Sequence, residues 1–361
     1  MKRLALAIAI ASISAAAGPA YAGGYEAPDN GTEALGRGAT FTAKADSPLA
    51  TYYNVGGLAT QRGTRLEVDV DLKFNNVEFQ RTGVYPGDAS NPYTPWAGQP
   101  FPNVKNRGGM FFAPGIYLSS DFHYFERWTF GLALFGPSSI GNRDYRYTTR
   151  APNGITYPSP GRYDFAGADL SIILPTVAAA VRVTRWLSLG LAVHLVYGNF
   201  ELRSTSIIDP GGTDTAGNPT CGIENPECDA KLALKVKGMT ATASFGAHIK
   251  LKNFAFGLNL RGPAYITAKG NAESISPRIL GGGVQEPSKA TFKNTLPIVL
   301  RLGGRYMFKK DDFERGDIEL DIVYESWKMA QNPGPTINMS GATSFAIDSN
   351  VAKSRAKASA S

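Results

Sequence analysis

The most persistent pattern in this sequence is the alternation of large apolar residues with small or polar ones. Between Trp186 and Gly198, one set of alternate positions carries Leu187, Leu189, Leu191, Val193, Leu195 and Tyr197. The other set carries Ser188, Gly190, Ala192, His194, Val196 and Gly198. A helix would scatter each set around its circumference, whereas a strand places the two sets on opposite faces. The stretch therefore predicts a strand whose faces meet different surroundings.

The same alternation returns along most of the chain and predicts an all-β protein. It recurs in residues 66–74, 128–135, 244–251, 254–260, 298–303 and 318–325. About nine strands can be counted in this way, with a tenth across Thr336 to Ile347. Two architectures produce the pattern: a soluble sandwich, which buries the apolar faces between two sheets, and a transmembrane barrel, which turns them towards lipid.

The strands and their connections favour the barrel. Several strands run for about ten residues, whereas strands of soluble sheets usually have about five or six, and their polar faces carry charges that suit a wet lumen. Aromatic residues stand near strand ends, as at a membrane interface; they are Trp128, Tyr197, Tyr306, Tyr324 and Trp327. Long connections near 80–106, 139–163, 203–230 and 269–290 alternate with short ones near 120–126, 184–185, 252–253 and 309–316. We therefore predict a transmembrane antiparallel outer-membrane β-barrel with long external loops and short periplasmic turns.

The N-terminus has the features of an export signal. Met1-Lys2-Arg3 is basic, residues 4–17 are apolar or small, and Ala20-Tyr21-Ala22 has the small-x-small pattern of a cleavage site. This segment is too short and too rich in small residues for a retained anchor helix. We predict a signal peptide over residues 1–22, cleaved after Ala22, and a location in the bacterial outer membrane.

Composition and charge exclude some partners. The sequence contains 40 Gly, 16 Tyr, 19 Phe and 4 Trp, which suits strands with two unlike faces. Its formal charge of +7 includes Lys2, Arg3, Lys353, Arg355 and Lys357 at the two ends, so the rest of the chain is close to neutral. We therefore expect no nucleic-acid partner.

The two cysteines, Cys221 and Cys228, lie close together in a polar stretch of the third long connection. In an exported protein such a pair predicts a loop disulfide. A metal site is the alternative, but it would need further His or Cys nearby. We expect no metal.

Residues 23–62 do not follow the strand pattern and are rich in Gly, Ala and small polar residues. The pattern alone leaves two interpretations open, a periplasmic arm and a compact plug inside the barrel. Residues 63–347 then hold the barrel strands and loops, and residues 348–361 form a low-complexity tail.

Residues of this N-terminal segment resemble the signature of the outer-membrane transporters of long-chain fatty acids and other hydrophobic compounds, the FadL-like family. The matching positions are Leu35, Gly36, Arg37, Asp46, Asn54, Gly57 and Leu58, with Val55 and Gly56 where the family usually has proline and alanine. Downstream, the stretches Ala113-Pro114, Arg127 to Pro137, Arg185 to Gly190, Leu296-Pro297 and Asp321 to Trp327 also fit. The resemblance covers most of residues 30–330.

The resemblance implies a monomeric barrel of fourteen strands whose residues 23–62 form a hatch. It implies uptake of a fatty acid, an aromatic hydrocarbon or a similar hydrophobic molecule, with sideways exit into the membrane lipid through a kink in the third strand. Gly136 and Pro137 are candidates for that kink, because proline cannot donate a ladder hydrogen bond and glycine leaves no side chain in the wall. Alternatively, these two residues simply end the strand and begin the loop.

Two other functions have less support. An enzyme would need a nucleophile with a base, or paired carboxylates, but the 3 His, His123, His194 and His248, fit a turn and the polar strand faces. We expect no enzyme activity and no cofactor. A general diffusion porin would need no plug. Lys250, Arg261 and Arg301 lie on lumen faces and are candidates for binding a ligand carboxylate; pairing with Glu67, Asp69, Glu319 or Asp321 is the alternative.

The C-terminal residues depart from the barrel pattern. Residues 348–361 show neither alternation nor a terminal aromatic residue, although a single-chain barrel has an even number of strands and must close. We therefore expect a chain truncated after about residue 340, or a smaller barrel. A truncated fragment without transport activity is a further alternative.

Overall fold

The structure is a computed structural model that describes residues 30–87, 95–136, 141–150, 154, 156–164, 166–207, 224–311, 313–330, 336–340 and 346–347. The expected signal peptide, the tail, Pro137 and Cys221 lie outside these residues. Among the helices described, none is long and apolar enough to cross a membrane.

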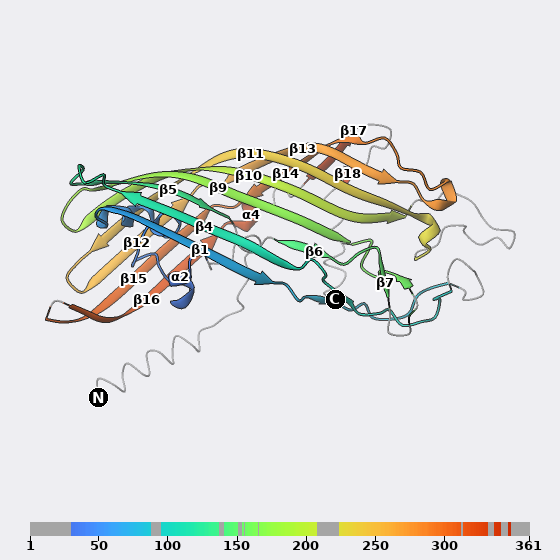
Figure 1. Ribbon diagram of the computed structural model, residues 1–361, viewed down its shortest axis with the longest axis horizontal. Helices are drawn as coiled ribbons and strands as arrows, with labels where there is room; N and C mark the ends of the chain where they lie inside the picture. Colours follow the sequence, from blue (N-terminus) through green and yellow to red (C-terminus); the bar gives the residue numbers. More distant parts are fainter. Residues whose placement is uncertain are drawn as a thin grey trace, which may run out of the picture.

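One antiparallel sheet holds nearly all the long strands, as the alternation predicted (Figure 1). Its first six long strands pair in order of sequence. They are β1 (Thr64–Phe74), β4 (Met110–Ser120), β5 (Trp128–Phe135), β9 (Gly167–Arg182), β10 (Leu187–Ile207) and β11 (Asp229–Lys250). The all-β antiparallel prediction is confirmed.

Beyond β11 the strands are broken into collinear pieces. β12 (Phe254–Arg261) and β13 (Ala264–Ile275) both pair with β11, and they are followed by β14 (Ser288–Leu296) and β15 (Val299–Lys310). The two breaks face each other across the sheet, because Arg261 pairs with Val299 and Ala264 with Leu296. The connection predicted near 269–290 has the wrong bounds, because β13 continues to Ile275 and β14 begins at Ser288, while Pro263 and Pro297 only interrupt the ladder.

The sheet ends in β16 (Phe313–Glu325), which pairs with β15, and in two short strands beyond the helix α4 (Trp327–Ala330). These are β17 (Thr336–Ser340), which pairs with β14, and β18 (Ala346–Ile347). They occupy the predicted tenth strand. Within the described residues, β1 pairs with β4 alone and β16 with β15 alone.

Long and short connections alternate along the sheet. The short turns, at 121–127, 183–186, 251–253 and 311, gather at one end. The long connections at the other end contain β2 (Glu78–Phe79), β3 (Val104–Lys105), β6 (Asn142–Asp144), β7 (Thr148–Arg150), β8 (Thr156–Pro158), η2 (Pro226–Cys228) and η3 (Arg278–Leu280). The loops after β10 and β13 are shorter than predicted, because the strands continue past the apolar region.

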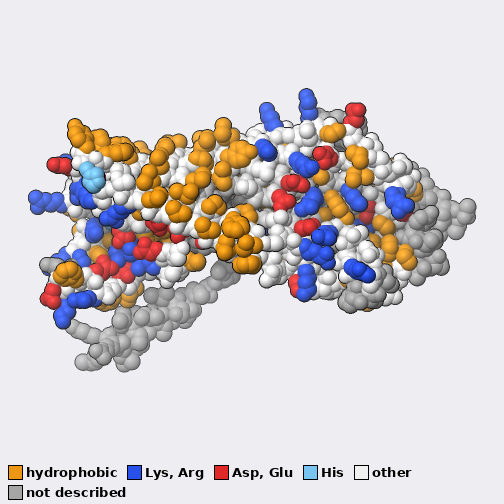
Figure 2. Space-filling model, viewed as in Figure 1, with side chains coloured by type: hydrophobic (Ala, Val, Ile, Leu, Met, Phe, Trp, Pro, Cys, Tyr) orange, Lys and Arg blue, Asp and Glu red, His pale blue; other side chains and the backbone are white. Residues whose placement is uncertain are grey.

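The alternation separates an inner from an outer face. On β10, Leu191 and Val193 are 62% and 54% exposed, whereas Ala192, His194 and Val196 are buried. The exposed apolar residues of neighbouring strands form a continuous belt over the half of the barrel nearer the short turns (Figure 2).

Candidate functional site

Residues 30–62, which we call the hatch, lie against the inner face of the barrel at the end with the short turns. They contain α2 (Thr32–Gly36), α3 (Ala50–Tyr53) and the 3-10 helix η1 (Val55–Thr60). Leu49, Tyr53, Val55 and Leu58 are completely buried. This part of the chain is therefore packed inside the barrel.

Four wall glycines bring the hatch backbone against the strands. Gly190 of β10 pairs with Gly246 of β11, and Gly257 of β12 pairs with Gly303 of β15. A Cβ atom on Gly257 would lie 1.9 Å from the carbonyl oxygen of Thr42, and one on Gly190 would lie 2.6 Å from the backbone of Val55. No side chain fits these wall positions while the hatch is seated.

Asn54, the asparagine of the hatch signature, joins the hatch to β11. Its Nδ2 donates to the carbonyl oxygens of Thr42, at 2.9 Å, and of Ala247, at 3.0 Å. Its Oδ1 accepts from the backbone N–H of Gly56 at 3.2 Å. Asn54 is fully buried, so these bonds satisfy polar atoms that have no access to water.

Carboxylates on the two edge strands hold the hatch by its backbone. On β16, Asp321 accepts from the N–H groups of Phe41 and Thr42, both at 3.0 Å. Glu319 accepts from those of Ala43 and Lys44, at 2.8 and 3.1 Å. Successive N–H groups directed at a carboxylate are charge-assisted bonds, about twice as strong as neutral ones.

The opposite edge strand, β1, does the same from its own side. Asp69 accepts from the N–H of Thr32 at 2.9 Å, and Glu67 accepts from the Ser47 hydroxyl at 2.7 Å. The hatch therefore bridges β1 and β16 through inward-facing carboxylates.

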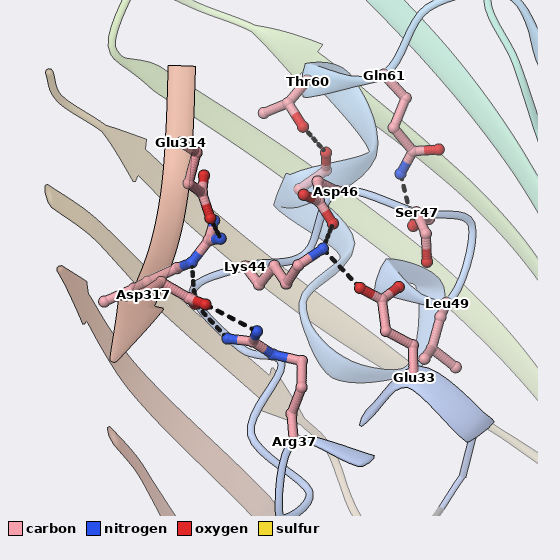
Figure 3. Close-up of polar contacts among 12 residues, drawn as sticks. Glu33, Arg37, Lys44, Asp46, Ser47, Leu49, Thr60, Gln61, Glu314 and Asp317 are labelled. Carbon is pink, nitrogen blue, oxygen red and sulfur yellow. Dashed lines mark hydrogen bonds and ion pairs between the residues drawn. The ribbon is translucent and has the colours of Figure 1, made fainter. Parts of the chain in front are cut away.

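Arg37 adds an ionic contact to this arrangement (Figure 3). Its guanidinium donates to both oxygens of Asp317, with one bond at 3.0 Å, and to Glu319 at 2.9 Å. The hydrogen bonds to Asp317 are the main cause of a raised pKa for Arg37. Arg37 therefore stays charged beside β16 at any physiological pH.

Lys44 lies between Asp46, at 2.5 Å, and Glu33, at 2.7 Å. Burial lowers the pKa of Lys44, but the hydrogen bonds to these two carboxylates outweigh that effect and raise it overall. Asp46, the acidic residue of the signature, thus pairs within the hatch.

The remaining signature residues divide between buried and exposed positions. Leu58 packs with small wall residues, Ala178, Ala180 and Ala192. A Cβ atom on Gly57 would lie 2.3 Å from the carbonyl oxygen of Ala45, which explains the glycine. Leu35 is 54% exposed, and Gly36 has open space around it, so neither forms part of the packed contact.

Above the hatch, the lumen is filled by apolar side chains. One apolar cluster contains hatch residues together with these inward-facing residues of seven strands: Tyr117, Phe135, Ile172, Leu174, Val196, Phe200, Leu234, Val236, Ile266 and Phe292. Tyr52 of the hatch lies 5.2 Å from the Phe135 ring, and the Phe200 and Phe292 rings lie 5.1 Å apart. This half of the lumen is therefore lined by apolar side chains rather than by the charges that suit a wet lumen.

Two of the three candidate cations, Arg261 and Arg301, lie close together on the neighbouring strands β12 and β15, whereas Lys250 lies apart. Arg301 is buried, donates to the Tyr52 hydroxyl at 2.9 Å and lies over the Tyr52 ring. Arg261 is buried one strand away, opposite Val299 of β15. Lys250 is exposed at the end of β11. The carboxylates named as their alternative partners, Glu67, Asp69, Glu319 and Asp321, bind the hatch.

Two of the three histidines have structural partners. His194 lies between the hydroxyls of Thr176, at 2.8 Å, and Ser244, at 2.7 Å, and His248 contacts the carbonyl oxygen of Ala43 at 2.8 Å. His123 lies in the turn after β4 with a positive φ of 55°. In the described part of the chain, no group of three or more His, Cys, Asp or Glu could hold a metal ion.

The wall is interrupted beside the third strand. β5 pairs with β9 only as far as Phe135, opposite Leu174, and β6 resumes the ladder at Asp169. Residues 170–173 of β9 have no partner on that side among the described residues. A Cβ atom on Gly136 would lie 2.5 Å from the carbonyl oxygen of Ile172; Pro137 lies outside the described residues.

Buried ion pairs join the loops at the far end. Arg162 contacts Glu224, which also pairs with Arg81, and bonds Asp229 at 2.7 Å. Cys228 is disulfide-bonded. Three separate connections thus meet at the loop end.

Similarity in structure adds an independent observation. A crystal structure of a Pseudomonas aeruginosa FadL homologue has a TM-score of 0.64 and 17% identity, over 90% of this chain and 75% of that one. The chain has the fold of the FadL-type barrels. The P. putida toluene transporter TodX has a TM-score of 0.52 and 18% identity, over 82% of this chain and 69% of that one. No protein-family model and no curated protein matches the sequence.

The wall glycines of this FadL-type barrel and the role of its carboxylates were not among the sequence predictions. Their signals were the glycines recurring at lumen-facing positions of four strands, and the carboxylates alternating with apolar residues on β1 and β16. The apolar lumen was not predicted either, and its signal is a loss of alternation, as in Ile172-Ile173-Leu174.

Proposed function

We propose that this chain is an outer-membrane channel for the uptake of hydrophobic small molecules. The observation that carries the proposal is the apolar filling of the lumen above a seated hatch. A porin conducts through a polar, water-filled lumen, and this interior offers apolar side chains instead. The FadL-type fold supports the same conclusion, and one protein with that fold, TodX, is a monoaromatic hydrocarbon channel.

In this proposal the chain is exported by residues 1–22, which are removed after Ala22, and works as a monomer without a cofactor. The ligand enters between the loops, crosses the apolar lumen and leaves sideways into the membrane. The stretch of β9 at 170–173, which has no ladder partner on the β5 side among the described residues, is the proposed exit. Backbone groups without a ladder partner at this position are compatible with an opening in the wall.

The cargo class can be tested with a pair of compounds. Purified protein in liposomes should admit toluene and a long-chain fatty acid, and it should exclude small sugars in a swelling assay. Rapid sugar entry would contradict the proposal and favour a porin. Absence of both activities would favour an inactive fragment.

The candidate cations distinguish the two cargoes. If Arg301 or Arg261 binds a ligand carboxylate, the conservative variants Arg301→Gln and Arg261→Gln should reduce fatty-acid uptake and leave toluene uptake unchanged. Lys250→Gln, at the exposed end of β11, is tested for the same difference between fatty-acid and toluene uptake. Equal losses for both cargoes would show that the arginines support the hatch or the wall instead.

A further inference from the structure

Five lysines lie on the outer face of three neighbouring strands, near the long loops. We call them the lysine patch: Lys235 and Lys237 of β11, Lys269 of β13, and Lys289 and Lys293 of β14. All five are exposed, and they alternate with buried apolar residues such as Leu234 and Val236. Since alternate residues of a strand point to opposite faces, these side chains point away from the lumen.

The patch begins where the apolar belt ends. Tyr197 of β10 pairs with Met239 of β11, and both are exposed on the outer face. The next outward position of β11 towards the loops is Lys237, opposite Asn199. On β13 the exposed Tyr265 likewise precedes Lys269. Lys and Arg side chains extend beyond the belt towards the loop end in Figure 2.

The lysines are crowded, and their two acidic neighbours, Glu201 and Glu273, both lie beside Lys235. Lys237 lies directly opposite Lys269 on the neighbouring strand. Lys293 lies opposite Thr267, which is the next outward residue of β13 after Lys269, so Lys269 and Lys293 are diagonal neighbours. Like charges directly opposite in a ladder repel each other. Lys235 pairs with Glu273 at 3.3 Å. For the other four lysines, the described residues supply no carboxylate within 4.0 Å, so their charges call for an anion from outside the chain.

We propose that the lysine patch binds the phosphate groups of the phosphorylated glycolipid of the outer leaflet, lipopolysaccharide, with Lys237 and Lys269 sharing one phosphate. The inference rests on the outer-membrane location proposed above. A lipid with its acyl chains against Met239 and Tyr265 holds its headgroup phosphates at the height of the lysines. Ammonium–phosphate hydrogen bonds are charge-assisted, and basic clusters just outside the apolar zone attract anionic lipid headgroups.

The test compares a patch variant with a control of equal charge. K237Q/K269Q removes two charges from the patch, and K252Q/K310Q removes two from exposed lysines at the opposite, short-turn end. Protein in phosphatidylcholine nanodiscs is titrated with lipopolysaccharide, dephosphorylated lipopolysaccharide, phosphatidylglycerol or inorganic phosphate. We expect the patch variant to bind lipopolysaccharide about tenfold or more weakly, and the control within about twofold of the wild type.

Dephosphorylated lipopolysaccharide should bind the wild type as weakly as lipopolysaccharide binds the patch variant. Three results would overturn the proposal: equal affinity of patch variant and wild type, equal loss in the control, or equal binding of phosphatidylglycerol. Competition by millimolar inorganic phosphate would also overturn it, since the patch would then be a general anion site.

Uptake assays separate this inference from the proposed function. Toluene uptake by K237Q/K269Q should equal that of the wild type, because the patch faces away from the lumen. If the wild type takes up no hydrophobic compound yet binds lipopolysaccharide through the patch, the transport proposal fails and the lipid site stands. Equal heat-modifiable gel migration of all variants excludes misfolding as the cause of any loss.

Discussion

The hatch end and the loop-side half of the barrel interior are filled in different ways. At the hatch end, wall glycines admit the backbone of residues 42–56, and carboxylates of β1 and β16 accept its N–H groups. In the loop-side half, side chains such as Val196, Phe200 and Phe292 fill the space with few polar contacts. The first region depends on close fit at single positions, and the second depends on apolar volume. Substitutions of similar size should therefore have unequal effects in the two regions.

The largest effect is expected at a wall glycine. Gly257→Ala places a methyl group where the carbonyl oxygen of Thr42 would lie 1.9 Å away, so the hatch or the strand must move. We expect a loss of about 3 kcal/mol in the free energy of unfolding, measured by denaturant titration in lipid vesicles. Gly304→Ala is the matched control, because its nearest atoms, in Phe256, lie 3.9 Å away. Equal stability of the two variants would contradict close packing of the hatch.

The next effect concerns Asn54. Asn54→Ala leaves the carbonyl oxygens of Thr42 and Ala247 and the N–H of Gly56 without a partner. We expect the free energy of unfolding to fall by about 2 kcal/mol. We also expect the variant to conduct an ion current across planar bilayers that the wild type lacks. Asn253→Ala, which removes one bond to Met307 in a turn, should produce no current. If the Asn54→Ala variant conducted no ion current, the hatch would be held in place without this residue.

A smaller effect is expected in the loop-side half. Phe200→Leu keeps an apolar side chain of moderate volume in contact with Phe292. We expect the free energy of unfolding to fall by about 1 kcal/mol and toluene uptake to be retained, because apolar cores tolerate such changes. If this variant proved as unstable as Gly257→Ala, the contrast between the two regions would be lost.

The smallest effect is expected at Lys44, whose partners Glu33 and Asp46 have side chains that are 41% and 40% exposed. Lys44→Met should lower the free energy of unfolding by about 0.5 kcal/mol, as the loss of other partly exposed ion pairs does. The pKa of Lys44 is raised in the folded protein, so its contribution is complete below the ordinary lysine pKa and is lost as the pH rises through the higher folded value. The difference between variant and wild type should therefore be constant between about pH 6 and pH 9.

Sequence periodicity was sufficient to predict the strands near the belt but not their full extent. Leu191 and Val193 face outward and Ala192 and His194 face inward, as the alternation required. Past Met239 the alternation inverts, with lysines outside and Leu234 and Val236 inside. The predicted strand began only at residue 244, so this loop-side part of β11 was not predicted.

The hatch was predicted from its resemblance to known signatures rather than from any pattern. Arg37 and Asn54 were recognised as its residues, but their partners, Asp317 and Ala247, lie about two hundred or more positions away. The two residues of each bond are 280 and 193 positions apart in the sequence. No local rule connects such positions.

The sequence by itself determined the all-β class, the outward apolar face and the order of long and short connections, since each follows from local alternation and turn chemistry. Only the tertiary structure decided which carboxylates hold the hatch, why glycine is needed at Gly190 and Gly257, and that the loop-side lumen is apolar. These features depend on which strands become neighbours and on what lies inside them. A sheet that curves around a segment brings together residues that no short window of sequence contains.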